Sequence, residues 1–178
     1  DVGGIPILQR NLNTLGRRIL NHRREDNRGV LFDSLELVLA RNRHSGELRL
    51  KTDPFAREFE LRPATASRFR PASPFHWQDD AWLAQRRAWD WLHAPLSIYE
   101  LHFGSWRRNA DGSSLTYRQA ADTLVPYVLS QGFTHVEFLP LTEFPLDESW
   151  GYQPVGYFAP TSRYGSPDDL RYLIDACH

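Results

Sequence analysis

The sequence predicts an α/β fold with parallel strands for residues 97–178, preceded by a region of short antiparallel strands. Three observations support this. Two stretches alternate apolar and polar residues, a helix with a clear start signal lies between them, and a second helix signal follows a long aromatic loop. Strand and helix in alternation are typical of right-handed βαβ units. The spacing alone leaves two architectures open, a doubly wound sheet and a (β/α)8 barrel.

The region before residue 70 is predicted to contain short strands. Residues 47–52 alternate Leu48 and Leu50 with charged neighbours, which is the two-residue period of a half-buried strand. Residues 44–46 have the composition of a hairpin turn, so the apolar segment before them is the expected partner strand. Residues 15–20 are predicted to form a short helix.

Prolines separate this region from the rest of the chain. They stand at positions 54, 63, 71 and 74. Because proline lacks a backbone donor and clashes with the preceding helical turn, residues 57–75 are expected to be extended and to hold no long helix. We predict a first unit at 1–69, a linker at 70–96 and a second unit at 97–178.

Two strands are predicted in the second unit. The first covers residues 97–103 and is ended by Gly104. The second covers residues 134–141, where Val136 and Phe138 share one face. The long connection after the second strand is the expected place for a ligand, because sites in both architectures gather at the carboxyl ends of parallel strands.

Capping signals mark the two helices. Thr116 and Gln119 form a capping box, and Gly132 provides the C-terminal end. Pro126 lies inside this segment, so we expect a kink or a displaced first turn. In the run Ser166-Pro167-Asp168-Asp169, serine is the N-cap, proline takes the first helical position, and the acids face the positive end of the helix dipole.

Composition argues against several classes of function. The formal net charge of -1 and the pI near 6.7 argue against binding nucleic acid or an anionic membrane through bulk electrostatics. No apolar run approaches the roughly 18 residues of a membrane span. A single cysteine excludes an internal disulfide, which fits a reducing cytoplasm. Because the sequence contains no methionine, we expect it to be an internal part of a longer chain.

The sequence lacks the common motifs of cofactor, phosphate, zinc and nucleophile sites, and its seven histidines show no pair at metal-ligand spacing. We therefore predict no cofactor and no metal. Glycoside chemistry would need two opposed carboxyl groups. Asp147 and Glu148 lie in a polar loop and are expected to be solvated, while Glu137 on the second strand is expected to have a structural partner.

The loop at residues 150–160 is the candidate binding site. It places Trp150 and Tyr152 among glycines, and Gln153 offers a donor and an acceptor. Flat aromatic rings beside a side-chain amide are suited to a hydroxyl-rich sugar ring. The alternative is a rigid hydrophobic plug over the end of a barrel, and composition does not decide between the two.

Four segments of the second unit carry a specific resemblance. They are 98–106 (IYELHFGSW), 133–140 (FTHVEFLP), 149–153 (SWGYQ) and 157–165 (YFAPTSRYG). These segments closely resemble bacterial 1,4-alpha-glucan branching enzymes of the alpha-amylase superfamily, and the match runs from about residue 77 to residue 178.

The resemblance implies that residues 97–178 open a (β/α)8 barrel and that residues 1–69 are the remnant of a β-sandwich module. It implies that Tyr152 lines the cleft near the sugar being cleaved, with Trp150 and Gln153 beside it. The implied enzyme is a cytoplasmic monomer that cuts α-1,4-glucan, such as amylose or glycogen, and transfers the segment to a 6-hydroxyl. Its catalytic Asp, Glu and second Asp are expected beyond His178, so residues 1–178 alone are expected to be inactive.

Two rival hypotheses remain at this stage. One is a related debranching or trehalose-releasing hydrolase, which typically has Gly-Thr-Phe where this chain has Gly104-Ser105-Trp106 and Asp in place of Gln153. The other is a non-catalytic or vestigial glucan-binding product of a truncated gene. Branching, hydrolysis or binding without turnover would distinguish the three.

Overall fold

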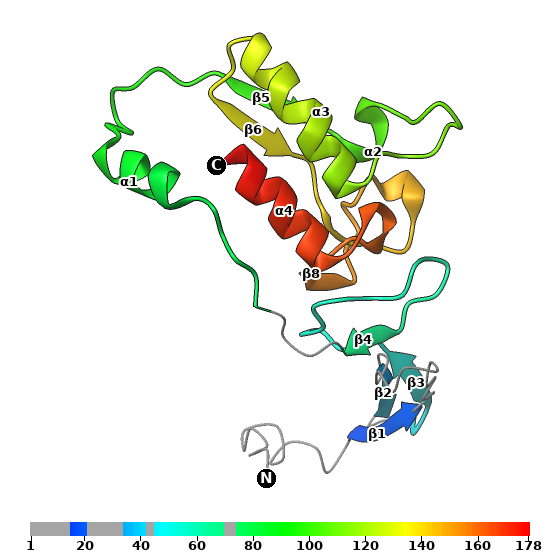
Figure 1. Cartoon of the computed structure of the whole chain (residues 1–178). Helices are drawn as coiled ribbons and strands as arrows, with labels where there is room; N and C mark the ends of the chain where they lie inside the picture. Colours follow the sequence, from blue (N-terminus) through cyan, green and yellow to red (C-terminus); the bar gives the residue numbers. More distant parts are fainter. Residues whose placement is uncertain (1–14, 21–33, 42–44, 70–73) are drawn as a thin grey trace, which may run out of the picture.

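The computed structural model describes residues 15–20, 34–41, 45–69 and 74–178. Figure 1 shows an antiparallel sheet at one end of the molecule and a larger body of helices and short strands at the other. One helix, α1 (Asp80–Ala88), lies on the extended connection between them.

The N-terminal sheet is built around one strand. Its members are β1 (Leu15–Leu20), β2 (Ser34–Arg41), β3 (Leu48–Lys51) and β4 (Ser67–Phe69). All three neighbours pair antiparallel with β2. Gly46 lies between β2 and β3 with φ 72°, a left-handed conformation that glycine adopts without steric cost, as the predicted hairpin requires. Part of that turn lies outside the described residues.

The predicted helix at residues 15–20 is wrong, because this segment is strand β1. It pairs with β2 from Leu15↔Ala40 to Leu20↔Leu35. The main-chain hydrogen bonds of a ladder come from a partner that is distant in sequence, and they outweigh a weak local preference.

The extended segment between the units holds more structure than predicted. Strand β4 and a bridge between Phe59 and Ser67 fall within residues 57–75. Helix α1 falls within the predicted linker 70–96. Its acidic first turn and basic last turn suit the helix dipole, but none of its residues is buried.

The parallel βαβ unit predicted from the sequence is confirmed. It consists of β5 (Ile98–Leu101), α3 (Tyr117–Ser130) and β6 (His135–Phe138). The two strands are parallel, in register from Ile98↔His135 to Leu101↔Phe138. The first strand ends earlier than predicted, because His102 precedes a short helix, α2 (Phe103–Trp106), whose first turn bonds to the His102 carbonyl.

Both predicted capping signals are confirmed. Thr116 and Gln119 make a reciprocal capping box at the start of α3, and Ser166 makes one with Asp169 at the start of α4 (Pro167–Cys177). Helix α3 begins where predicted and continues past Pro126 to Ser130. Of the two predicted effects of Pro126, the displaced first turn is therefore wrong and the kink stays a prediction. The proline removes one backbone donor from the helix.

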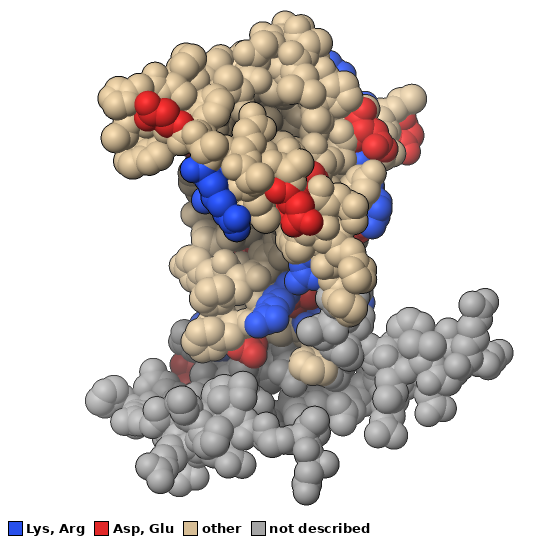
Figure 2. All heavy atoms as spheres, turned by 60° about the vertical axis from the view of Figure 1, so that its left-hand side comes forward, with Lys and Arg blue, Asp and Glu red and all other residues tan. Residues whose placement is uncertain are grey.

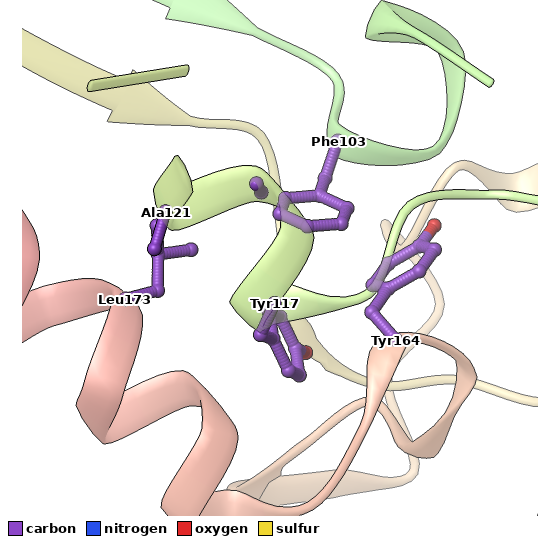
Figure 3. Close-up of a cluster of buried hydrophobic side chains, with 6 residues drawn as sticks. Phe103, Tyr117, Ala121, Tyr164 and Leu173 are labelled. Carbon is purple, nitrogen blue, oxygen red and sulfur yellow. The ribbon is translucent and has the colours of Figure 1, made fainter. Parts of the chain in front are cut away.

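Aromatic and aliphatic side chains from four elements form the main core, shown in Figure 3. Phe103 of α2 and Tyr164 lie 4.5 Å apart between ring centroids. Tyr117 of α3 and Leu173 of α4 are fully buried beside them. A second cluster, Leu101, Leu124 and Val128, packs β5 against α3. These clusters fix α3 and α4 as a single layer next to the parallel strands (Figure 1).

Beyond the parallel pair the chain forms a separate antiparallel ribbon of β7 (Thr142–Glu143) and β8 (Gly156–Pro160). The strands of the described residues form no closed barrel. None of the described helices is long and apolar enough to cross a membrane. On the face shown in Figure 2, described charged residues of both signs are scattered in small groups.

Candidate functional site

The candidate site is the loop that joins β7 to β8. A third apolar cluster of Ala56, Phe59 and Ala159 fixes β8 against the N-terminal region. Gly156 is required at this contact, because a Cβ atom there would lie 2.3 Å from the Phe59 ring. Backbone hydrogen bonds of 2.8 Å from Val155 to Glu143 and of 2.7 Å from Thr161 to Leu141 close the base of the loop.

The tip of the loop has a tightly determined backbone. A short 3-10 helix, η2 (Asp147–Ser149), leads into Trp150 at φ 56° and Gly151 at φ 93°. A Cβ atom on Gly151 would lie 2.7 Å from the carbonyl oxygen of Pro140, so only glycine fits there. Trp150 is the one non-glycine residue with positive φ in the described part of the chain. Bulky residues adopt that conformation only where the surroundings enforce it.

All three residues predicted to bind sugar lie on the surface of this tip. Trp150 retains 53% of its accessible surface and Tyr152 retains 65%, and Gln153 is also exposed. None of them belongs to a buried cluster of the described residues. In this chain the tip therefore presents its rings to solvent, and their stacking on a sugar stays a prediction.

The Trp150 ring contacts a residue from the first parallel strand. The imidazole of His102 stacks on it, with ring centroids 4.8 Å apart and an interplanar angle of 25°. His102 also shares a 2.7 Å hydrogen bond between its Nδ1 and Ser105 Oγ. Desolvation lowers the pKa of His102 from its ordinary value, so burial favours the neutral ring. The carboxyl end of β5 and the loop tip thus meet, as expected for a parallel-strand site.

A buried ion pair stabilises the base of the loop. Glu143 on β7 and Arg163 after β8 lie 3.0 Å apart, and their side chains are only 5% and 6% exposed. Glu143 also accepts hydrogen bonds from Thr161 Oγ1 at 3.1 Å, from the Phe144 amide at 3.0 Å and from the Ser162 amide at 2.6 Å. The Arg163 guanidinium lies 3.8 Å from the centre of the Phe144 ring. Both charged groups thus have further partners besides each other, as buried charges require.

Asp147 extends the ion pair into a network that reaches the N-terminal region. It accepts from Arg163 Nη2 at 2.7 Å and from Arg62 Nε at 2.6 Å. The Arg62 hydrogen bond holds the pKa of the Asp147 carboxyl below its ordinary value against opposing desolvation, and Arg163 adds to this effect. The prediction that Asp147 is simply solvated is therefore wrong. Arg62 is 85 positions away, a distance at which no local sequence signal indicates a partner.

Three carboxylates near the loop have structural partners among the described residues. Glu143 and Asp147 share Arg163, and Asp169 caps α4 and pairs with Arg118. Glu137 and Glu148 are exposed. The structural partner expected for Glu137 is not found among the described residues, so that prediction is wrong, whereas the exposure of Glu148 agrees with the prediction that it is solvated. Among the described residues no group of three or more His, Cys, Asp and Glu side chains is placed to hold a metal ion.

Comparison with known proteins shows extensive sequence similarity. No protein-family model matches the chain. The 1,4-alpha-glucan branching enzyme GlgB of Nitrosospira multiformis is 57% identical over 150 residues, which are 84% of this chain and 20% of that enzyme. The 1,4-alpha-glucan branching enzyme GlgB of Methylococcus capsulatus is 59% identical over 138 residues, 78% of this chain and 19% of that enzyme. The chain thus spans about a fifth of the length of the curated relatives it matches.

A solved structure shows the same general fold. A protein described as an alpha amylase from Salmonella typhimurium superposes with a TM-score of 0.60 at 26% identity, covering 84% of this chain and 23% of that one.

Proposed function

Because this chain belongs to the family of the 1,4-alpha-glucan branching enzymes, we propose that it forms one wall of the glucan cleft of such an enzyme. The observation that carries the proposal is the loop tip at residues 150–153. It presents an indole, a phenol and a side-chain amide on a backbone fixed by Gly151 and by the Glu143–Arg163 ion pair.

The chemistry of the tip suits an α-1,4-glucan such as amylose or glycogen. In this proposal the faces of Trp150 and Tyr152 pack against the apolar faces of glucose rings, while Gln153 donates to and accepts from sugar hydroxyls. The loop is held before substrate arrives, so little conformational entropy is lost on binding. Its role is to bind and orient the glucan.

The reaction of the whole enzyme is part of the proposal. It cleaves an α-1,4 bond and transfers the released segment to a 6-hydroxyl, which creates an α-1,6 branch. A retaining transfer needs a nucleophilic carboxylate and a carboxyl acid/base. Glu143, Asp147 and Asp169 have structural partners. We propose that the catalytic groups come from residues outside the 178 of this chain, that the 178 residues alone are inactive, and that no cofactor or metal takes part.

The arrangement of the domains is also proposed. The parallel β5–α3–β6 unit supports the opening of a (β/α)8 barrel at residues 97–178. The antiparallel sheet supports a β-sandwich module within residues 1–69. Residues 70–96, with α1, would connect the two. We further propose a cytoplasmic monomer. The hydrolase and the vestigial glucan-binding protein are less favoured than a branching enzyme at 57% identity.

Two tyrosine variants of the full-length protein test the proposed role of the loop. Tyr152→Ala removes a ring from the tip, and we expect it to lower kcat/KM for amylose branching about tenfold, the upper end of what one lost aromatic contact produces. Tyr157→Ala is the matched control, because Tyr157 is similarly exposed at 68% but belongs to β8 and not to the tip at residues 150–153. It should stay within about twofold of the parent protein.

The assay measures the α-1,6 bonds formed from amylose. Equal effects of the two variants would contradict the proposed role of the tip. Release of reducing sugar without new branches in the parent protein would favour the hydrolase instead.

A further inference from the structure

The His102–Trp150 contact joins two parts of the molecule that are distant in sequence. His102 follows β5 and precedes α2, whereas Trp150 belongs to the loop after β7. Their rings are nearly parallel at 25°, with centroids 4.8 Å apart. Stacking of this kind orients a ring and does not only bury its surface.

The imidazole is itself held in place. Ser105 lies in α2, and its Oγ is 2.7 Å from His102 Nδ1. Ser105 is fixed by its position in the helical turn, where its amide bonds to the His102 carbonyl at 3.1 Å. The hydrogen bond to Ser105 therefore restricts the orientation of the imidazole ring that stacks on the indole.

Trp150 needs such a support, because other contacts fix its backbone but not its ring. The backbone is set by the left-handed φ of 56° and by a hydrogen bond from the Trp150 amide to the Asp147 carbonyl at 3.0 Å. The side chain is 53% exposed and belongs to no buried cluster in the described part of the molecule. His102 is the ring partner that the structure shows for it.

We infer that His102, oriented by Ser105, is a positioning residue that holds the Trp150 indole in the plane required for stacking on a glucose ring. The inference rests on the proposed role of the loop as a glucan-binding wall and adds a specific residue to it. His102 touches no substrate in this scheme. It acts only through Trp150, so its loss should weaken glucan binding and leave the chemical step unchanged.

Two substitutions in the full-length protein separate the ring from the hydrogen bond. His102→Phe retains a flat ring for the indole and loses the contact to Ser105. His102→Asn retains a polar group near the position of Nδ1 and loses the ring. His135→Asn is the matched control. The Nδ1 of His135 likewise shares a hydrogen bond with a hydroxyl, at 2.8 Å from Thr134 Oγ1, but His135 lies on β6 with no tryptophan against it among the described contacts.

The first readout is glucan affinity, measured by titration with maltoheptaose and by KM for amylose. We expect His102→Asn to raise the dissociation constant and KM about threefold to tenfold, the range that corresponds to one lost aromatic pair, with kcat unchanged. His102→Phe should recover most of the affinity, and His135→Asn should match the parent protein. A fall in kcat without a change in KM, or no effect of His102→Asn, would overturn the inference.

The second readout reports on the ring directly. In protein labelled with 5-fluorotryptophan, the fluorine signal of Trp150 is assigned by its loss in Trp150→Phe. We expect that signal to shift or broaden in His102→Asn and in Ser105→Ala, while the remaining tryptophan signals stay in place and confirm that the protein is folded. An unmoved Trp150 signal would overturn the inference.

The two readouts also separate this inference from the proposed function. If Trp150→Ala leaves glucan affinity unchanged, the proposed role of the loop fails, whatever His102 does to the fluorine signal. If Trp150→Ala weakens binding and His102→Asn does not, the loop retains its role and only the inference about His102 fails.

Discussion

At the scale of single residues, the loop is stabilised by charges that the sequence does not bring together. Arg163 lies between Glu143 and Asp147, and Arg62 reaches Asp147 from the N-terminal region. The sequence identified Trp150, Tyr152 and Gln153 as candidates because two aromatic rings and an amide suit a sugar ring, and their binding of sugar stays a prediction. Their support was not predictable, since Arg62 has no sequence signal that relates it to position 147.

The lowered pKa of Asp147 predicts a pH dependence of the loop. A carboxyl whose pKa is lower in the folded state contributes stability above its unfolded pKa of about 3.9 and loses that contribution as pH falls through the folded pKa. Because the Asp147 side chain is 51% exposed, we expect only about 0.5–1 kcal/mol. Asp147→Asn should therefore lower the free energy of loop opening at pH 7 by this amount, and the difference should shrink toward zero below about pH 4.

Amide hydrogen exchange of residues 144–155 in the full-length protein, corrected for the intrinsic effect of pH, measures this free energy. Glu148→Gln is the control, because Glu148 is a neighbouring carboxylate outside the arginine network. A difference between Asp147→Asn and the parent protein that persists unchanged into acid would show that charge pairing is not its cause.

At the scale of elements, the ends of helices α3 and α4 are set by local chemistry. Thr116 and Gln119 satisfy each other's backbone groups at the start of α3, and Ser166 does the same with Asp169 at the start of α4. These contacts span three residues, so the sequence alone was sufficient to locate them. Helix α3 then carries Tyr117 into the main core and Leu124 into the cluster with Leu101 of β5.

A pair of threonine variants tests the cap of α3. Thr116→Ala removes the side-chain acceptor of the capping box, and we expect it to destabilise the helix by about 1 kcal/mol. Thr123→Ala is the matched control, since the Thr123 hydroxyl donates to the Gln119 carbonyl from inside the same helix and takes no part in the cap. Alanine has the higher helix propensity there, so this variant should be neutral or slightly stabilising. Hydrogen exchange of the α3 amides measures both, and equal effects would contradict the assigned role of the cap.

The strands were predictable from the sequence only where their own residues carry the signal. The alternation of apolar and polar residues located β3, β5 and β6, because successive side chains of a strand point to opposite faces. It did not locate β1, whose ladder depends on β2. It also placed the end of β5 too late, since the hydrogen bonds that begin α2 at His102 take over from the strand. In both places, hydrogen bonds that the alternation pattern does not reveal determine the structure.

At the scale of the whole molecule, contacts among the described residues connect the N-terminal region to the candidate site. Phe59 packs beneath β8, Arg62 bonds to Asp147, and Ser162 donates to the Glu60 carbonyl at 3.2 Å. The parallel β5–β6 pair lies on the other side of the loop and supplies His102. The loop tip is thus fixed from two sides, and the rings at residues 150–153 remain exposed.

The central claim is that this tip contacts an α-1,4-glucan, and hydrogen exchange of the full-length protein with and without maltoheptaose tests it most directly. A β-1,4-linked oligosaccharide of equal length serves as the control ligand. We predict that maltoheptaose slows exchange in the segment 144–155 and that the β-linked sugar does not. Protection by maltoheptaose elsewhere in the protein, with exchange in this segment unchanged, would contradict the account.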